Sequence, residues 1–116
     1  MSNAEHNRRI DYIEFSVPSI SEVKRFYGKA FGWSFEDYGP DYTSFADGRL
    51  TGGFQTATGA RGGPLVVIYG VDLEAMERRV REAGGTIVRP IFSFPGGRRF
   101  HFTDPGGTEL AVWSDQ

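Results

Sequence analysis

Hydrophobic and polar residues alternate along the start of the chain and then change their spacing. Within residues 10–17, apolar side chains occupy every second position from Ile13 onward, which predicts a strand with one apolar and one polar face. Residues 19–31 place apolar side chains three and four positions apart behind a Ser19/Glu22 capping box, which predicts an amphipathic helix. Three short stretches rich in β-prone residues follow, at residues 33–37, 42–46 and 50–56. The first half of the chain is therefore predicted to be βαβββ.

The same order of elements returns in the second half. Residues 65–71 form a nearly continuous apolar strand, and Asp72 can cap a second amphipathic helix. Three more predicted strands follow, at residues 86–91, 99–103 and 108–113. Aligning Val17 with Val71, each at the end of a strand that precedes a helix, relates the two halves by an offset of about 54 residues.

We therefore predict an α+β fold in which two βαβββ units form a curved mixed sheet around a cleft, with the helices outside. The units span residues 10–56 and 64–114 and together make a single domain over residues 10–116. Residues 57–63 have the composition of a linker, and residues 1–9 are interpreted as a disordered or tag-derived start. Because neither unit closes its sheet alone, each must pair with its sister or with a unit of a second chain, and we expect a homodimer.

Composition narrows the classes of partner. The chain has 116 residues, no cysteine and a formal net charge of -2, which excludes disulfides and a cysteine nucleophile and argues against a nucleic-acid surface. No apolar run approaches the roughly 20 residues of a membrane span, and the polar start lacks the apolar centre of a secretory signal. We expect a cytoplasmic protein with a small-molecule ligand and neither nucleic acid nor membrane as a partner.

Four motifs carry a resemblance to a known family. They are Arg25-Phe26-Tyr27, Ala30-Phe31-Gly32-Trp33, Glu82-Ala83-Gly84-Gly85 and Phe102-Thr103-Asp104-Pro105-Gly106-Gly107. Together with the paired βαβββ units, they make the chain resemble the vicinal oxygen chelate superfamily, which includes glyoxalase I, bleomycin resistance proteins, fosfomycin resistance enzymes and extradiol dioxygenases. The resemblance covers nearly the whole chain and looks most like a glyoxalase-like branch.

Metal-bearing members of that superfamily hold a divalent ion with His, Gln or Glu side chains from four strands. The resemblance places these positions at Tyr12, near Gly53 or Gln55, at Val66 and at Ala111, with Glu109 two residues before the last. Tyr12, Val66 and Ala111 do not suit this role, so we expect a branch that lacks the metal ligands and carries no cofactor. A rearranged site built from Glu14, Gln55, His101 and Glu109 stays open as an alternative.

Glu14 and His101 are the candidate catalytic residues. A carboxylate in the middle of a strand is costly to bury without a partner, so Glu14 is either a general base or ligand anchor, or the structural partner of an arginine such as Arg98 or Arg99. The imidazole of His101 suits proton transfer, although strand histidines also serve in packing. Arg98 and Arg99 follow a Gly-rich loop and either clamp an anionic group or remain solvated. The predicted ligand-binding residues of the cleft are Tyr12, Gln55, Val66, Ile68, Arg98, Glu109, Ala111 and Trp113.

Three functions are compatible with this pattern. The leading one is a metal-free protein that binds a small organic molecule, as the resemblance to the bleomycin resistance branch implies. The alternative is a lyase or isomerase of the glyoxalase family that uses Glu14 as base and His101 as acid, with or without a divalent metal. The third is a structural or regulatory module whose cleft has no ligand. A shared scaffold does not choose among them, because one fold hosts many chemistries.

Overall fold

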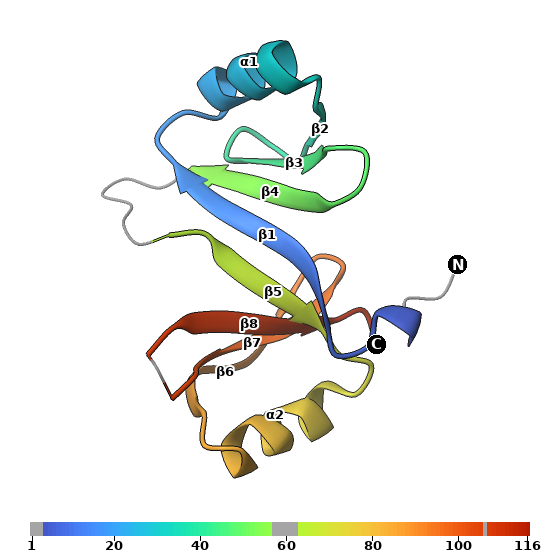
Figure 1. Ribbon diagram of the computed structural model, residues 1–116, viewed down its shortest axis with the longest axis vertical. Coiled ribbons are helices and arrows are strands. Elements are labelled where there is room, and N and C mark those ends of the chain that lie inside the picture. Colours follow the sequence, from blue (N-terminus) through green and yellow to red (C-terminus); the bar gives the residue numbers. More distant parts are fainter. Residues whose placement is uncertain (1–3, 57–62, 106) are drawn as a thin grey trace. The chain divides into compact units, whose positions relative to one another are not determined.

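The computed structural model describes residues 4–56, 63–105 and 107–116. Over these ranges the chain is α+β, with two helices and eight strands of mixed sheet in two βαβββ repeats (Figure 1), which confirms the predicted fold class. The chain divides into two compact units. The N-terminal unit runs from Tyr12 to Leu65, and the C-terminal unit comprises Val66–Gln116 together with the segment that ends at Asp11. Neither helix of the described chain is long and apolar enough to cross a membrane.

The N-terminal unit is one helix against a four-stranded sheet. Its elements are β1 (Arg9–Val17), α1 (Ile20–Phe31), β2 (Ser34–Asp37), β3 (Tyr42–Ala46) and β4 (Thr51–Thr56). The strands are ordered β2-β3-β4-β1, with β1 parallel to β4 and the other neighbours antiparallel. α1 begins where Ser19 Oγ accepts a hydrogen bond from the Glu22 backbone N–H at 3.3 Å, and it ends at Gly32, whose φ of 73° favours glycine.

Aromatic rings join α1 to one face of this sheet. Tyr27 stacks on Trp33 and on Phe54, with ring centroids 4.6 and 5.5 Å apart. Phe15 of β1 stacks on the same Phe54 at 5.3 Å. Because side chains alternate along a strand, Glu14 and its neighbours of the same parity project from the opposite face. The alternation read in the sequence thus separates an aromatic core from a polar surface.

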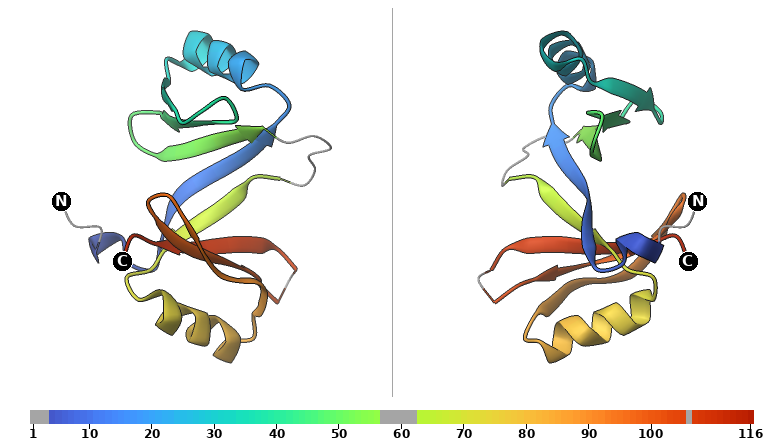
Figure 2. Two further views of the ribbon diagram at one scale, coloured as in Figure 1. Left: turned by 180° about the vertical axis from the view of Figure 1, so that it is seen from behind. Right: turned by 45° about the vertical axis from the view of Figure 1, so that its right-hand side comes forward.

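The C-terminal unit repeats this arrangement with an aliphatic core. Its elements are β5 (Leu65–Tyr69), α2 (Leu73–Glu82), β6 (Thr86–Phe94), β7 (Gly97–Thr103) and β8 (Glu109–Ser114), and its strands are ordered β5-β8-β7-β6. α2 starts at Asp72, whose Oδ1 accepts a hydrogen bond from the Ala75 N–H at 3.1 Å. The helix lies against strands β6 to β8, as the views in Figure 2 show. Leu73, Phe100 and Val112 are at most 1% exposed beneath it, with Ile68, Met76, Val80, Ile87, Ile91 and Phe102 packed around them.

The N-terminal segment is held by hydrogen bonds within the C-terminal unit. Ala4–His6 forms a short 3-10 helix. The Arg8 N–H donates to the Tyr69 carbonyl at 2.7 Å, and Asn7 Oδ1 accepts from the Val71 N–H at 2.8 Å. Residues 4–9, which the sequence suggested as part of a disordered or tag-derived start, include this 3-10 helix and the first residue of β1, whereas residues 1–3 lie outside the described residues.

Candidate functional site

Polar and aromatic side chains gather on one face of the C-terminal sheet. Phe100 packs toward α2, so Arg99 and His101, its neighbours along β7, project from the opposite face. Antiparallel pairing with β8 sets Arg99 beside Trp113, and it sets His101 beside Ala111. We call this side of the sheet the His101 face. It comprises the buried residues Tyr69, His101 and Ala111 and the half-buried residues Phe92, Phe94, Arg99 and Trp113.

The imidazole of His101 is buried and has one nitrogen engaged and one open. His101 is only 7% exposed, and its Nδ1 lies 2.9 Å from Glu109 Oε2. Nε2 is buried without a hydrogen-bond partner among the described residues. Since the Glu109 carboxylate only accepts hydrogen bonds, it favours the tautomer in which Nδ1 carries the proton. Nε2 is then an acceptor with a free lone pair.

Burial keeps this ring uncharged. The pKa of His101 is lowered from its usual 6.5, chiefly because burial disfavours the imidazolium, with the nearby charges of Arg99 and Arg89 acting in the same direction. The hydrogen bond to Glu109 opposes the shift without overcoming it. At neutral pH the site therefore presents a neutral acceptor beside fixed positive charge.

Arginine and aromatic groups surround that acceptor. The Arg89 guanidinium carbon lies 3.7 Å from the centroid of the Phe92 ring, and that of Arg99 lies 5.6 Å from the same centroid. Phe92 is itself 5.8 Å from the His101 ring, centroid to centroid. Cation–π contact of this kind holds guanidinium groups flat against apolar surface. The surface thus combines flat apolar area with cationic donors.

Trp113 is positioned by a chain of hydrogen bonds from the N-terminal segment. Its indole Nε1 donates to Asp11 Oδ2 at 2.9 Å, and Asp11 Oδ1 lies 3.1 Å from His6 Nδ1. The Trp113 ring also contacts Tyr69 and Phe94, with centroids 5.2 and 6.4 Å apart. A ring held by polar contact at its edge and apolar contact on its sides offers a fixed binding surface.

The N-terminal unit holds a second polar cluster. Glu14 is 6% exposed, and its Oε2 accepts a hydrogen bond of 3.1 Å from the Tyr42 hydroxyl, which also hydrogen-bonds the Tyr12 hydroxyl. The pKa of Tyr42 is raised strongly, first by burial and then by the Tyr12 hydrogen bond and the Glu14 charge. Tyr42 therefore remains a protonated donor. Gly53 makes room for the pair, since a Cβ there would lie 1.9 Å from the Tyr42 oxygen.

Gln55, another predicted ligand-binding residue, lies at the end of this cluster. Its register partners are Ser16 on β1 and Tyr42 on β3, so it shares their face of the sheet. Its Nε2 donates to Ser16 Oγ at 3.2 Å. Tyr12, Glu14 and Gln55 thus share one face of the sheet, as period-2 alternation implied. Tyr12 and Glu14 are linked through the Tyr42 hydroxyl, whereas Gln55 bonds Ser16.

The structure places Arg98 on the opposite side of β7 from His101. Arg98 pairs with Ser114 in the β7–β8 ladder, so its side chain has the opposite parity to Arg99. Its guanidinium forms two hydrogen bonds with Glu74 of α2, at 2.7 and 3.3 Å. Arg98 ties β7 to α2, and Arg99 is the arginine of the His101 face.

The expectation that Val66 and Ile68 share a face with Ala111 is wrong. In the parallel β5–β8 pair, Val67 is opposite Ala111, whereas Val66 and Ile68 take the alternate parity, and Ile68 packs into the core under α2. The helix caps explain the error, because Ser19 and Asp72 are 53 positions apart and the sequence alignment assumed 54. A shift of one residue moves every side chain of a strand to the other face.

Nothing in the sequence indicated that three other residues lie around His101. Arg89, Phe92 and Phe94 lie on β6, whose pairing with β7 shifts register between Ile87 and Arg89 and again between Arg89 and Phe92. Such irregularities interrupt period-2 alternation, so residue parity does not place these side chains. Arg99 did have a signal, because it lies two residues before His101 in an unbroken strand.

The residues at the metal positions of the resemblance do not fit a divalent ion. Val66, its neighbour Val67 on the face of Ala111, and Ala111 itself have no side-chain donor atom, and the Tyr12 hydroxyl is hydrogen-bonded to Tyr42. Across residues 4–56, 63–105 and 107–116, no three His, Asp or Glu side chains are grouped as metal ligands. The side chains of the His101 face can supply hydrogen bonding, cation–anion attraction and aromatic contact.

Comparison with known proteins gives a family and a fold. A family model described as Glyoxalase/Bleomycin resistance protein/Dioxygenase superfamily matches residues 9–112. A hypothetical protein of Bacillus halodurans C-125 is similar in structure, with a TM-score of 0.75 and 16% identity over 93% of this chain and 94% of that one. A glyoxalase/bleomycin resistance protein/dioxygenase superfamily member from Vibrio splendidus 12B01 gives a TM-score of 0.71 and 15% identity over 91% and 97%.

Methylmalonyl-CoA epimerase from Mycobacterium tuberculosis is similar to the same degree. Its TM-score is 0.71, with 16% identity over 90% of this chain and 86% of the epimerase. Identities this low show a shared fold and do not by themselves show a shared activity. No curated protein matches the sequence.

Proposed function

Because this chain belongs to the Glyoxalase/Bleomycin resistance protein/Dioxygenase superfamily, whose one scaffold serves many chemistries, we propose a function from its own side chains: it binds a small planar organic anion on the His101 face. The observation that carries the proposal is the open Nε2 of His101, a buried acceptor with no partner among the described residues. The ligand has three parts, which are a hydroxyl or N–H group, a flat apolar body and an anionic group.

The hydroxyl or N–H group is selected by Nε2. Leaving a buried acceptor unsatisfied costs about 1–3 kcal/mol, and a ligand donor removes that cost. A ligand of the same shape without the donor gains nothing from this nitrogen. Glu109 supports the selection, because its hydrogen bond to Nδ1 keeps the lone pair on Nε2.

The anionic group and the flat body are selected by the surroundings. Arg99 and Arg89 both lie against Phe92, so their guanidinium N–H groups border apolar surface, where attraction to an anion is stronger than in bulk water. Phe92, Phe94 and Trp113 offer ring faces and edges to a planar ligand. A hydroxylated aromatic carboxylate unites the three requirements.

Three probes separate these contributions, and Trp113 supplies the readout. Its indole N–H resonance in ¹⁵N-labelled protein reports binding, and that of Trp33, which lies in the aromatic core of the other unit, serves as the reference. We expect 4-hydroxybenzoate to bind about tenfold more tightly than benzoate, a difference of about 1.4 kcal/mol. Phenol, which lacks the anionic group, binds more weakly than either carboxylate.

Variants assign each difference to a residue. His101→Phe abolishes the preference for 4-hydroxybenzoate over benzoate, and Arg99→Gln weakens both carboxylates alike. Arg98→Gln is the matched control, because Arg98 has the opposite parity on the same strand and pairs with Glu74. A folded His101→Phe variant that keeps the preference would contradict the proposal.

A second candidate function is proton transfer, with His101 as the general base. The observation in its favour is the His101–Glu109 pair, in which a carboxylate orients an imidazole whose other nitrogen is open, as in a general base held by an orienting group. Its test is deuterium uptake from D₂O at the α-carbon of 4-hydroxymandelate, followed by mass spectrometry. Uptake that His101→Phe abolishes supports an enzyme, and binding without uptake supports the binder.

A further inference from the structure

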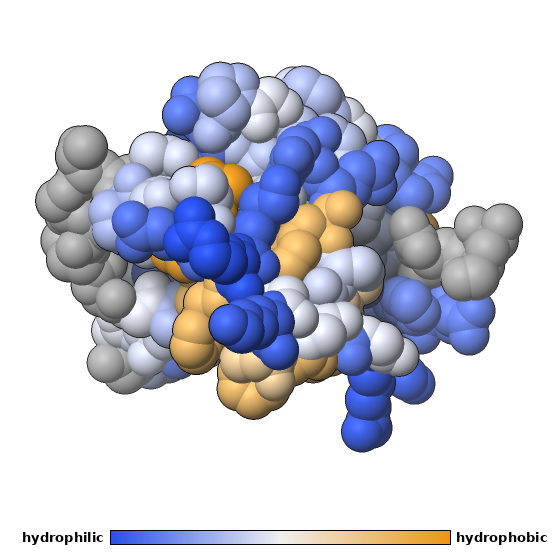
Figure 3. All heavy atoms as spheres, turned by 90° about the horizontal axis from the view of Figure 1, so that it is seen from above, coloured by the Kyte–Doolittle hydropathy of each residue, from blue (hydrophilic) through white to orange (hydrophobic). Residues whose placement is uncertain are grey.

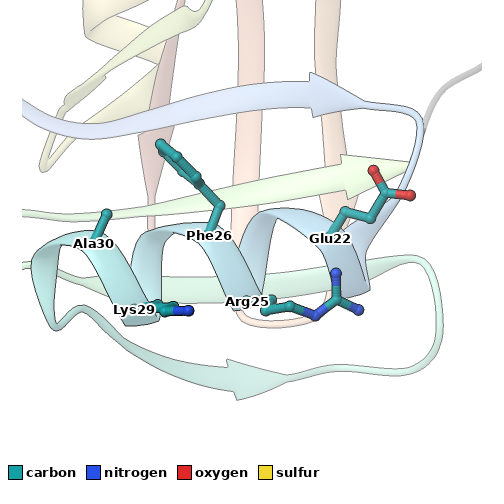
Figure 4. Close-up of a pocket in the computed structure, with 5 residues that line it drawn as sticks. All are labelled: Glu22, Arg25, Phe26, Lys29 and Ala30. Atoms are coloured by element: carbon teal, nitrogen blue, oxygen red, sulfur yellow. The ribbon is translucent and has the colours of Figure 1, made fainter.

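Two shallow hollows on the described surface differ in how they are built. The larger, of about 630 Å³, lies on the outer side of α1 (Figure 4) and is lined by Glu22, Arg25, Phe26, Lys29 and Ala30. The view from above, the side that α1 occupies in Figure 1, shows apolar next to strongly hydrophilic surface (Figure 3). All five residues belong to one regular helix, so this hollow is the space between neighbouring side chains of a solvated helix face.

The smaller hollow, of about 270 Å³, is assembled in the C-terminal unit from two segments that are far apart in the sequence. Its lining comes from the N-terminal segment and from the start of α2, and it consists of Asn7, Arg8, Val71, Asp72, Ala75, Met76 and Arg79. We call this space the Arg8 hollow. A hollow that exists only because the chain folds two distant segments together is a better candidate for a site than a gap along one helix.

The backbone is strained at Arg8. Among residues 4–56, 63–105 and 107–116, it is the one residue other than glycine with a positive φ, at 63°. This left-handed conformation costs free energy in any residue that has a Cβ. Two hydrogen bonds impose it, because the Arg8 N–H donates to the Tyr69 carbonyl at 2.7 Å and Asn7 Oδ1 accepts from the Val71 N–H at 2.8 Å. Strain of this kind is found mainly at functional sites, where the surrounding contacts maintain it.

Two guanidinium groups border the Arg8 hollow, those of Arg8 and of Arg79 on α2. Both residues are exposed, and neither forms a salt bridge with a carboxylate of the described chain. Asp72 also lines the hollow, but its Oδ1 accepts the hydrogen bond from the Ala75 N–H at the start of α2. The N–H donors of two arginines are therefore left for a ligand that enters the hollow.

Apolar side chains line the rest of the hollow. Val71, Ala75 and Met76 are half-buried there. Met76 lies close against the connection between β5 and α2, since a Cβ at Gly70 would be 2.8 Å from Met76 Cγ. The volume is below the roughly 300–1,000 Å³ of sites for drug-sized ligands, so a ligand that fits here is small. The hollow suits a compact anion with a short apolar group.

We propose that the Arg8 hollow binds the phosphate group of a small phosphomonoester. Such a group carries a charge of about −1.5 to −2 at pH 7 and three terminal oxygens, so it can accept hydrogen bonds from both guanidinium groups at once. A carboxylate has two oxygens and one negative charge, and it satisfies two arginines less completely. The short organic group packs on Ala75 and Met76. This site is separate from the one proposed on the His101 face and shares no residue with it.

Three probes test the proposal on the ¹⁵N-labelled full chain. Propyl phosphate and butyrate carry the same propyl group on different anions, and inorganic phosphate lacks that group. At pH 7.5 and constant ionic strength, we expect propyl phosphate to bind about tenfold more tightly than butyrate and about threefold more tightly than inorganic phosphate. The readout is the shift of the backbone amide resonances of Asn7, Arg8, Ala75 and Met76. No saturable binding up to about 20 mM, or butyrate or inorganic phosphate as tight as propyl phosphate, overturns the proposal.

Arginine variants assign the binding to the hollow. Glycine adopts a φ of 63° without strain, so Arg8→Gly removes the guanidinium while the Tm stays the same or rises. We expect Arg8→Gly and Arg79→Gln each to weaken the binding of propyl phosphate about tenfold. Arg9→Gln and Arg78→Gln are the matched controls, because each exposed arginine adjoins a tested one and does not line the hollow. An equal loss in tested and control variants would indicate diffuse attraction to basic surface and would overturn the proposal.

Two further outcomes would place the phosphate elsewhere. Binding of propyl phosphate that falls in Arg99→Gln and not in Arg79→Gln would assign the anion to the His101 face, and it would overturn this proposal while leaving the other intact. Co-sedimentation with phosphatidic acid vesicles, without saturable binding of propyl phosphate, would assign the arginines to a lipid headgroup and equally overturn it. The two proposed sites fail separately, because the preference for 4-hydroxybenzoate is read at Trp113 and tested by His101→Phe.

Discussion

The two βαβββ units build the same elements and leave their polar faces in different states. In the N-terminal unit, Glu14 accepts a hydrogen bond from Tyr42, which also bonds Tyr12 above Gly53. In the C-terminal unit, the comparable polar group is His101, with one nitrogen on Glu109 and the other open. A binding site on this scaffold depends less on how many polar residues face one side than on which polar atoms remain unsatisfied.

The two helices also differ in how they pack against their sheets. α1 is attached through stacked aromatic rings and has no fully buried residue, whereas α2 buries Leu73 in an aliphatic core and carries an ion pair from Glu74 to Arg98. Aromatic side chains fill a large volume with few rotatable bonds, so they lose little conformational entropy on packing. Their size leaves part of α1 uncovered. The unit that satisfies its polar face is therefore the one that exposes apolar surface.

The largest expected effect comes from a substitution at Gly53, which lies against the Tyr12–Tyr42–Glu14 cluster. Gly53→Ala sets a Cβ 1.9 Å from the Tyr42 oxygen and should destabilise the protein by about 2–3 kcal/mol, as overpacking does elsewhere. Urea denaturation measures it. Gly63→Ala, where no heavy atom lies within 4 Å of the added Cβ, should change stability little. The added Cβ would also lie 2.4 Å from Tyr42 Cζ, so the matched background is Tyr42→Ala, which removes the whole ring. Gly53→Ala should cost less stability in the Tyr42→Ala background than in the wild type, and an equal cost in both would show that the clash is not with Tyr42.

The second prediction is that a variant in the C-terminal unit changes ligand preference, whereas a variant in the N-terminal unit changes stability. His101→Phe should abolish the roughly tenfold preference for 4-hydroxybenzoate, worth about 1.4 kcal/mol, while Glu14→Gln should leave this preference intact. Glu14→Gln instead weakens the hydrogen bond from Tyr42 and should lower the free energy of unfolding by about 1 kcal/mol. Titration and denaturation of both variants give the four values. Loss of the preference in Glu14→Gln would place Glu14 in the ligand site.

The third prediction compares the helix caps. Asp72→Ala removes a 3.1 Å cap hydrogen bond and a negative charge at the start of α2, and it should cost about 1 kcal/mol. Ser19→Ala removes a longer, 3.3 Å bond at α1 and should cost about half as much. Thermal unfolding of the two variants ranks them. A larger loss for Ser19→Ala would mean that α1 depends more on its cap than on its aromatic contacts.

The smallest effect is a dependence of stability on pH that belongs to the C-terminal unit. Because the pKa of His101 is lower in the folded chain than the usual 6.5, the unfolded chain takes up a proton first as the pH falls. The contribution of the neutral ring is complete above pH 6.5 and is lost as the pH falls below it, toward the lowered pKa. Urea denaturation at intervals from pH 8 to pH 5 should show a shallower decline for His101→Phe than for the wild type. Parallel declines would show that His101 does not titrate differently on folding.

Sequence reasoning placed those residues whose strands alternate without interruption. Tyr12, Glu14 and Gln55 share a face, and so do His101, Ala111 and Trp113, because β1, β4, β7 and β8 are regular. The Ser19 and Asp72 caps were also identified, since cap chemistry is local. Regular alternation is thus enough to place a side chain on a face, although it does not identify its partner across the sheet.

What escaped the sequence required knowledge of register or irregularity. Val66 and Ile68 were placed by aligning the two halves of the chain with an offset one residue too long. Because side chains alternate along a strand, this error assigned both residues to the wrong face. Arg98 was chosen beside Arg99 although it shares the parity of Phe100 and so belongs to the α2 side. Phe92 follows two register shifts in the pairing of β6 with β7. The alternation of apolar and polar residues within one strand does not reveal such shifts.

Gly53 also constrains how this protein can evolve. Every amino acid other than glycine adds a Cβ at this position, and that Cβ overlaps the Tyr42 hydroxyl. A histidine or glutamate at position 53 is therefore not one selectable step away, because the substitution is costly until Tyr42 has first been replaced by a smaller residue. The order of the two changes matters, and the first one dismantles the hydrogen bond to Glu14 before any benefit of the second exists. Through this one glycine, the tyrosine cluster acts as an epistatic barrier between the present chemistry of the N-terminal unit and a lineage with a ligating side chain at this point of β4.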